Sequence, residues 1–227
     1  MTLADVMREL RVYGAGEPVP SPVLPLWIDG HAYVTVTPAF GEVKCARSGQ
    51  VLRRFPLCGE AEVRRALDSA LAAQPLWAAF PEGTRRDCLR RLGETLAGYV
   101  WHFSALLSEE CACELAQAEA ELNALLALLR EPPEGPAATL AAVAANASQP
   151  LLSPLKLALP VLLTGGVVIV LTSPAAPSVL VAFAELTGRS GLPAGVLSLL
   201  HGDRSTWESL DREGVSRLPP DPRGRPD

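Results

Sequence analysis

The order in which apolar segments alternate over the second half of the sequence constrains the fold most strongly. Segments 139–145, 167–171 and 196–200 are short and almost wholly apolar, and the longer segments 150–163 and 177–190 between them have helical character. Strands that are apolar on both faces are typical of a parallel sheet covered by helices. The sequence therefore predicts an α/β fold with a partial Rossmann-like parallel sheet.

The first half predicts a small β element followed by four helices. Segments 27–30 and 33–36 indicate an antiparallel pair, a turn is expected at 38–41, and 51–55 is a candidate for a further edge strand. Apolar residues at helical spacing then indicate helices from about 59 to 77, 81 to 96, 99 to 110 and 114 to 130. Two adjacent prolines, Pro132 and Pro133, end the last of these helices.

The composition divides the chain into three regions. Residues 1–24 are rich in proline and glycine, so we expect a flexible leader. Residues 25–203 form the predicted α/β domain. Residues 204–227 end in a stretch rich in proline and arginine, for which we predict a disordered tail.

The charge pattern argues against nucleic acid and membrane partners. The formal net charge of the 227 residues is -5, and Arg85, Arg86, Arg90 and Arg91 recur at helical spacing, as expected of a solvated helix face. The first ten residues lack the apolar stretch of a signal peptide. The apolar segment 157–171 is too short to span a bilayer and contains a proline and a glycine turn, so a buried helix and strand explain it better.

The cysteine, histidine and carboxylate residues show no metal-ligand spacing. The five cysteines are odd in number and include no CxxC pair, which favours structural thiols in a reducing compartment and hence the cytoplasm. The three histidines have no carboxylate or cysteine partner at ligand spacing. Two acidic pairs, Glu109 with Glu110 and Glu119 with Glu121, are interpreted as solvated helix faces rather than paired catalytic carboxylates.

Two segments carry a resemblance to a known family. Residues 162–170 and the helix-to-strand corner 191–196, Gly-Leu-Pro-Ala-Gly-Val, resemble the aldehyde dehydrogenase superfamily, and the order of motifs from Trp27 to Gly202 agrees with it. Within that superfamily, the chain looks like the degenerate second copy of the tandem-domain subfamily. The resemblance implies an incomplete cofactor-binding domain of the Rossmann type.

One implied site residue is Ser148. Members of the family carry an asparagine whose amide helps to hold the oxyanion formed on the substrate, and a count without gaps from Gly165 puts Ser148 at that position. A serine hydroxyl is shorter than an amide and less fixed. Because loss of one such donor typically lowers the rate about 10² to 10³-fold, the resemblance implies an impaired oxyanion site. Taken without the resemblance, Ser148 is a turn or capping residue.

The implied cofactor site is degenerate. In the family, a glycine turn and a buried strand lead to a Lys-Pro-Ser-Glu segment whose lysine and glutamate hold the adenosine ribose of NAD. Here the turn is Gly165 and Gly166, the lysine and glutamate positions fall on Leu171 and Pro174, and Ser173 alone is retained. We therefore expect no tight binding of NAD. Taken alone, a glycine pair between a helix and a strand is usually a tight turn.

Further family residues are not matched within the sequence. The catalytic cysteine, the general-base glutamate and the glycine-rich turn over the pyrophosphate lie, in the family, beyond the position that corresponds to residue 227, so no catalytic residue is assigned. Segment 130–148 is short for the β-hairpin that pairs subunits in the family, so that route to an oligomer is not expected. No metal site is predicted.

Three hypotheses follow. The first is a pseudoenzyme that binds a protein partner as an interaction or scaffold module, because an incomplete sheet leaves an unpaired edge and apolar surface. The second is a fragment of an NAD-dependent oxidoreductase acting on aldehydes, whose catalytic half lies elsewhere. The third is a truncation product without a stable fold.

Overall fold

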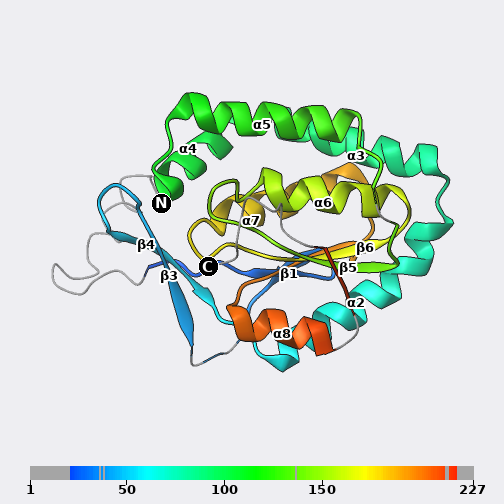
Figure 1. Ribbon diagram of the computed structural model, residues 1–227, viewed down its shortest axis with the longest axis horizontal. Helices are drawn as coiled ribbons and strands as arrows, with labels where there is room; N and C mark the ends of the chain where they lie inside the picture. Colours follow the sequence, from blue (N-terminus) through cyan, green and yellow to red (C-terminus); the bar gives the residue numbers. More distant parts are fainter. Residues whose placement is uncertain (1–20, 36, 38, 136, 213–214, 219–227) are drawn as a thin grey trace, which may run out of the picture.

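The computed structural model describes residues 21–35, 37, 39–135, 137–212 and 215–218. A six-stranded sheet in the order β2-β1-β7-β6-β5-β8 lies between layers of helices (Figure 1). Its strands are β1 (Leu26–Ile28), β2 (His31–Tyr33), β5 (Leu140–Ala144), β6 (Val167–Leu171), β7 (Leu197–Leu200) and β8 (Ser216–Leu218). A separate antiparallel pair consists of β3 (Phe40–Lys44) and β4 (Val51–Pro56).

The four carboxyl-terminal strands of the sheet run parallel. β6 pairs with β5 and β7, and β8 pairs with the far side of β5. Every residue of β6 is buried, which explains why this strand is an uninterrupted apolar run in the sequence. The predicted α/β class and parallel sheet are confirmed, and the three predicted strands agree with β5, β6 and β7 to within a residue or two.

Helices cover both faces of the sheet. In Figure 1, α2 and α8 lie on one face, α6 and α7 on the other, and the remaining helices form an outer layer over α6 and α7. The helices are α2 (Glu60–Ala79), α3 (Glu82–Ala97), α4 (Val100–Cys111), α5 (Leu115–Arg130), α6 (Leu152–Leu163), α7 (Ser178–Ser190) and α8 (Arg204–Arg212). Since α6 and α7 follow consecutive strands and share one face, these connections form the expected crossovers.

Side chains of α2 and α3 attach these helices to the carboxyl ends of α6 and α7. The Trp77 indole donates to the Leu162 carbonyl oxygen at 2.8 Å, and Arg85 Nε donates to the carbonyl oxygen of Leu163 at 2.7 Å. Arg91 Nε donates to the carbonyl oxygen of Ser190 at 2.9 Å. These donors satisfy carbonyl groups in the last turns of α6 and α7.

The expected solvated arginine face is wrong only for Arg85, which is half-buried, since Arg86, Arg90 and Arg91 are exposed. Arg85 and Arg91 both donate to carbonyl groups at helix ends. Arg86 and Arg90 do lie on the outside of α3, where they form exposed ion pairs with acidic residues of the same helix. Helical spacing alone cannot separate the two pairs, because carbonyl partners come from helices about 80 to 100 residues away in the sequence.

The amino-terminal β element differs from the prediction in its pairing. β1 and β2 form an antiparallel hairpin, but β1 also pairs with β7 and so extends the main sheet. The strand expected at 51–55 does form as β4, yet it pairs with β3 in the segment where a turn was expected. The alternation of polar and apolar residues in Phe40–Lys44 is short and contains a glycine, so its pattern did not predict a strand.

The predicted domain limits are too narrow at both ends. Residues 22 and 24 exchange backbone hydrogen bonds with Arg54 of β4, so the leader does not extend to residue 24. Residues 204–212 form α8 and 216–218 form β8, which corrects the prediction of a disordered tail from residue 204. The parts of the predicted leader and tail at 1–20 and 219–227 lie outside the described residues.

A pair of glycines tests the packing of the α6 to β6 turn. A Cβ at Gly166 would overlap the carbonyl oxygen of Ala138, whereas a Cβ at Gly83, in the first turn of α3, meets nothing within 4 Å. We expect Gly166→Ala to lower the free energy of unfolding by about 3 kcal/mol, as overpacking does. Gly83→Ala is expected to be neutral or to stabilise by up to about 1 kcal/mol. Urea unfolding curves of both variants measure this, and equal stabilities would contradict the packing described.

Candidate functional site

The carboxyl ends of the parallel strands meet at one edge of the sheet, where proteins of this topology bind their ligands. Counted along the chain, the parallel strands lie in the spatial order third, second, first, fourth. The order reverses between β5 and β8, and this switch point is the usual position of a dinucleotide. Segments 145–149, 172–177 and 201–203 leave the sheet at this edge.

Ser148 lies in the turn between β5 and α6. Its hydroxyl donates to Asn146 Oδ1 at 3.0 Å, and the Gln149 amide N–H donates to the same oxygen at 2.8 Å. The Asn146 amide in turn donates to Ser153 Oγ at 2.8 Å, and Asn146 is only 9% exposed. The Ser148 hydroxyl hydrogen is thus used inside the turn. A hydroxyl has one hydrogen to donate, so in this arrangement it is not offered to an oxyanion.

Segment 171–174 presents little polar chemistry at the end of β6. Leu171 is 7% exposed and belongs to the hydrophobic core. The Ser173 side chain is buried, and its Oγ accepts a hydrogen bond from the amide of Ala175 at 3.4 Å. Pro174 is exposed and carries no side-chain donor or acceptor. A ribose that approached this edge would meet hydrocarbon where the resemblance implies ammonium and carboxylate groups.

Gly165 and Gly166 lie at the other edge of the sheet. They precede β6, so its five residues, about 16 Å of strand, separate them from segment 171–174. Gly165 has φ +92°, the left-handed region, and its carbonyl oxygen accepts a hydrogen bond from Gln74 of α2. The structure therefore does not bring the glycine turn together with Leu171, Ser173 and Pro174. Its geometry is that of a tight helix-to-strand turn packed on α2.

His201 follows β7 at the carboxyl edge and is completely buried. Its Nδ1 lies 2.7 Å from Thr172 Oγ1, and its Nε2 lies 3.0 Å from the carbonyl oxygen of Pro25. Burial disfavours the charged imidazolium and lowers the pKa of His201 to about 4. The ring joins the ends of β6 and β7 to the segment before β1, and it has no free face for a ligand.

Two carboxylates, the buried Glu110 and the half-buried Glu121, support the helices that flank this edge. Glu110 accepts a hydrogen bond from the Ser178 amide at 3.2 Å and forms an ion pair with Arg53 at 3.1 Å. Glu121 accepts from the amides of Leu151 and Leu152, at 3.1 and 2.9 Å. Burial raises the pKa of both carboxyl groups. The interpretation of these glutamates as solvated is wrong, because each binds the amino-terminal amides of a helix, α7 and α6 respectively.

Burial makes the thiols of Cys58 and Cys111 unreactive. Burial raises the pKa of Cys58 to about 12 and that of Cys111 to about 12, so the reactive thiolate is scarce at neutral pH. Within the part of the chain that the structure describes, no group of three or more histidine, cysteine, aspartate or glutamate side chains is arranged to hold a metal ion. None of the helices described there has the length and apolar character needed to cross a membrane.

Comparison with known proteins identifies the family. The sequence profile of the aldehyde dehydrogenase family matches residues 35–142 and 146–212. The chain belongs to the aldehyde dehydrogenase family. It is 23% identical over 207 residues to the probable methylmalonate-semialdehyde/malonate-semialdehyde dehydrogenase [acylating], mitochondrial, of Caenorhabditis elegans, covering 82% of this chain and 40% of that protein. With the lactaldehyde dehydrogenase of Escherichia coli K12 it shares 27% identity over 80% of this chain and 43% of that protein.

Solved structures of aldehyde dehydrogenases share the fold. A putative methylmalonate-semialdehyde dehydrogenase of Sinorhizobium meliloti, complexed with NAD, superposes with a TM-score of 0.77 at 21% identity, over 88% of this chain and 50% of that one. The Brucella melitensis aldehyde dehydrogenase gives a TM-score of 0.78 at 19% identity, over 85% of this chain and 44% of that one. The chain therefore spans about two fifths to one half of the length of these relatives.

Sequence reasoning missed Asn146, Glu110 and His201, which organise this edge. For Glu110 a signal was present, because it continues the buried stripe of α4 formed by Phe103, Leu106 and Leu107. A carboxylate on an apolar stripe indicates a buried partner. Asn146 and His201 each follow a strand end, but nothing in the sequence shows that their side chains turn inward.

The buried His201 predicts a pH dependence of stability. Unfolding restores the ordinary pKa of 6.5, so between about pH 6.5 and 4 the unfolded chain takes up a proton that the folded chain refuses. Stability therefore falls on acidification, by about 3 kcal/mol from this group at pH 4. His201→Gln, which stays neutral, is expected to be less stable at pH 7 and to lose less on acidification. Urea unfolding at pH 7, 5.5 and 4.5 checks this, and parallel pH profiles would contradict it.

Proposed function

We propose that this aldehyde dehydrogenase-family chain is non-catalytic and acts by binding another protein. We further propose that it corresponds to the degenerate second copy of the tandem-domain subfamily. The observation that carries the first proposal is the buried hydrocarbon of Leu171 beside the bare ring of Pro174, at the two positions where the family's ribose-holding lysine and glutamate are expected.

The residues at the carboxyl edge do not fit the family's cofactor. Leu171 can donate no hydrogen bond to a ribose hydroxyl, and Pro174 can accept none through its side chain. Hydrogen bonds to charged groups each contribute about 1.5 to 3 kcal/mol, so loss of both weakens binding by several powers of ten. The Ser148 hydroxyl, engaged with Asn146 at 3.0 Å, is likewise a poor substitute for a free amide donor.

An exposed apolar face on α2 supports the proposed role in protein binding. The face is formed by Leu71, Ala72, Pro75, Leu76 and Ala79, which are exposed and fall on one side of the helix. Leu71 and Leu76 are 54% and 65% exposed, and no charged residue occurs between Asp68 and Glu82. A contiguous apolar surface of this kind is typical of an interaction site.

The five cysteines are all unpaired, which supports a reducing compartment such as the cytoplasm.

A second candidate function is that of one part of an NAD-dependent oxidoreductase whose catalytic half is supplied elsewhere. It is favoured by the strand order, which keeps the switch point of a dinucleotide-binding fold. A relative of the same fold has been solved with NAD. On this alternative, backbone groups at the switch point would have to hold the dinucleotide without the lysine and glutamate.

Cofactor binding separates the two candidates. We expect NAD at roughly millimolar concentration to leave the melting temperature of the chain unchanged, because a ligand that binds the folded state stabilises it in proportion to ln(1 + [L]/Kd). The Sinorhizobium meliloti relative, whose structure holds NAD, serves as the positive control in the same thermal assay. A melting temperature that already rises at micromolar NAD and continues to rise logarithmically with its concentration would overturn the non-catalytic proposal.

The α2 apolar face is tested by placing charges on it. Leu71→Glu with Leu76→Glu is expected to weaken partner binding at least about tenfold, since each buried leucine contributes about 1.5 to 3 kcal/mol. Stability should change little, because both side chains are exposed. The matched control is Val34→Glu with Leu115→Glu, which charges two other exposed apolar residues, 76% and 53% exposed, outside α2.

The readout is the set of proteins that co-purify with each variant from the expressing cells, quantified against the unaltered chain. Two results would contradict a partner on α2. In the first, both double variants lose the same proteins; in the second, neither variant loses any. Light scattering of the purified chain over a concentration series shows whether that partner is a second copy.

A further inference from the structure

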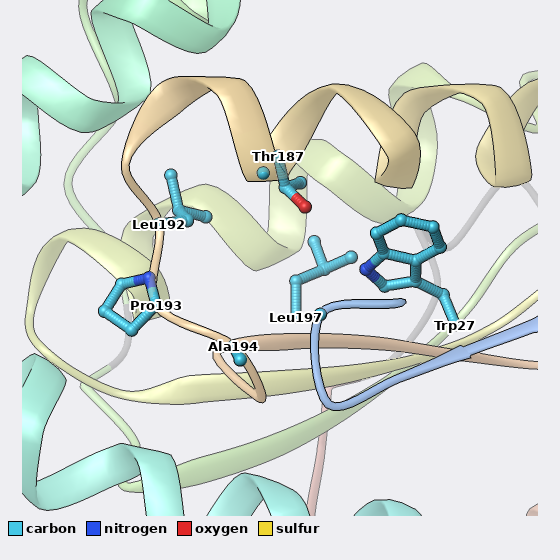
Figure 2. A pocket seen from close by; sticks show the side chains of 8 residues that line it. Trp27, Thr187, Leu192, Pro193, Ala194 and Leu197 are labelled. Carbon is cyan, nitrogen blue, oxygen red and sulfur yellow. The ribbon is translucent and has the colours of Figure 1, made fainter. Parts of the chain in front are cut away.

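A small pocket and the apolar face of α2 both lie away from the carboxyl edge. The pocket, of about 170 Å³, lies between the end of α7, the β1–β2 turn and the start of β7 (Figure 2). No ionisable side chain lines it, and the indole Nε1 of Trp27 is buried. The Thr187 hydroxyl donates to the carbonyl oxygen of Ala184 within α7. The side chains of the pocket therefore offer a ligand no accessible donor, whereas the α2 face is open.

The exposed residues of α2 follow a regular stripe along the helix. Arg65, Asp68, Ala72, Pro75 and Ala79 are all exposed and recur at spacings of three and four residues, on the side opposite the buried residues of the helix. Alternating spacings of three and four are those by which two helices pack side by side along their length. We call these five residues the α2 stripe. Its alanines have short side chains, so a second helix can approach the backbone closely.

The α2 stripe has the same spacing in both directions. Ala72 and Pro75 lie at equal distances from a midpoint between them, and so do Asp68 and Ala79. An identical helix that runs in the opposite direction therefore places its Pro75 opposite Ala72 and its Ala79 opposite Asp68. A two-fold contact requires such a self-complementary surface, because the same residues serve both copies.

The two exposed leucines lie at the centre of this arrangement. Leu71 and Leu76 are equally far from the midpoint of the stripe and lie on its two flanks. They are 54% and 65% exposed, so most of their apolar surface is in contact with water in the isolated chain. An antiparallel pair of α2 helices covers both flanks of the contact with these leucines, and the water is released.

The two ends of α2 are complementary in charge. Arg64 and Arg65 are exposed in its amino-terminal half, whereas its last turn contains no basic residue and is followed by Glu82 of α3. In an antiparallel pair, the arginines of one copy lie near the carboxyl end of α2 in the other copy, where the helix dipole and Glu82 are negative. The single carboxylate of Asp68 leaves this arginine end of the stripe with a net positive charge.

We propose that the α2 helices of two copies of this chain pack antiparallel about a two-fold axis. The proposal rests on the proposed protein-binding role of the α2 face and names the partner of that face, a second copy. α2 has 20 residues and is about 30 Å long, so the contact is smaller than a standard protein interface. The dimer is therefore weak, and its population depends on the concentration of the chain.

Sedimentation velocity of the purified full-length chain measures this association. Between about 1 μM and about 1 mM, the weight-average mass is expected to rise from 24.0 kDa towards twice that value. Leu71→Glu with Leu76→Glu should raise the dissociation constant at least about tenfold, because both buried leucines are replaced by charges. The control Val34→Glu with Leu115→Glu should leave it within about twofold.

Charge complementation tests the antiparallel arrangement itself. Ala72→Glu and Pro75→Lys each place a charge in the contact, and each variant alone should dimerise at least about tenfold more weakly than the unaltered chain. When the two variants are mixed, the new carboxylate and ammonium groups face each other, so association should recover about tenfold. The matched control is Ala72→Glu mixed with Pro75→Glu, which brings two like charges together and should show no recovery.

Three results would overturn the proposal. A chain that keeps a mass of 24.0 kDa at about 1 mM forms no such dimer. A dimer that persists unchanged in Leu71→Glu with Leu76→Glu uses another surface. Equal recovery with Pro75→Lys and with Pro75→Glu would exclude the antiparallel contact. If the chain stays monomeric but Leu71→Glu with Leu76→Glu still loses co-purified proteins, the α2 face binds a different protein, so the proposed function stands and the homodimer does not.

Discussion

Strand β6 is covered on both faces, by α6 on one side and α2 on the other, and every residue in it is buried. A strand in this position can carry no exposed functional group along its length, so chemistry is confined to the segments that leave its two ends. The residues that follow the strand ends can therefore differ in type without disturbing the packing of the strand itself. Leu171 shows how this works, because a hydrocarbon at the strand end extends the core and leaves the fold intact.

The centre of the fold could be predicted because its pattern is local. Segments 167–171 and 177–190 are each long and apolar enough to specify a strand and a helix, and both appear almost at the expected bounds. β3 and α8 were missed for the opposite reason. β3 contains Gly41 and depends on pairing with β4, and α8 is a short, strongly polar helix whose position depends on packing against α2.

The residues that the resemblance implies for the candidate site do not lie together. Ser148, Leu171 and Pro174 are at or next to the carboxyl ends of β5 and β6. Gly165 and Gly166 lie at the opposite edge of the sheet. A linear motif cannot show this, because the whole length of β6 lies between these glycines and segment 171–174. Asn146 and His201 were missed because an inward side chain depends on contacts from Ser153, Thr172 and Pro25, which are distant in the sequence or outside the motif.

Four charged side chains bind the ends of the inner helices. Glu110 and Glu121 bind the amino-terminal amides of α7 and α6, and Arg91 and Arg85 bind carbonyl groups at the other ends of the same helices. Removing Glu110, which is buried, would leave an amide of α7 unsatisfied inside the protein. At positions 171 and 174, where the resemblance implies ribose-holding side chains, a leucine and a proline satisfy no backbone group. The fold thus depends on polar side chains that bind helix ends, whereas it does not depend on polar side chains at these two positions.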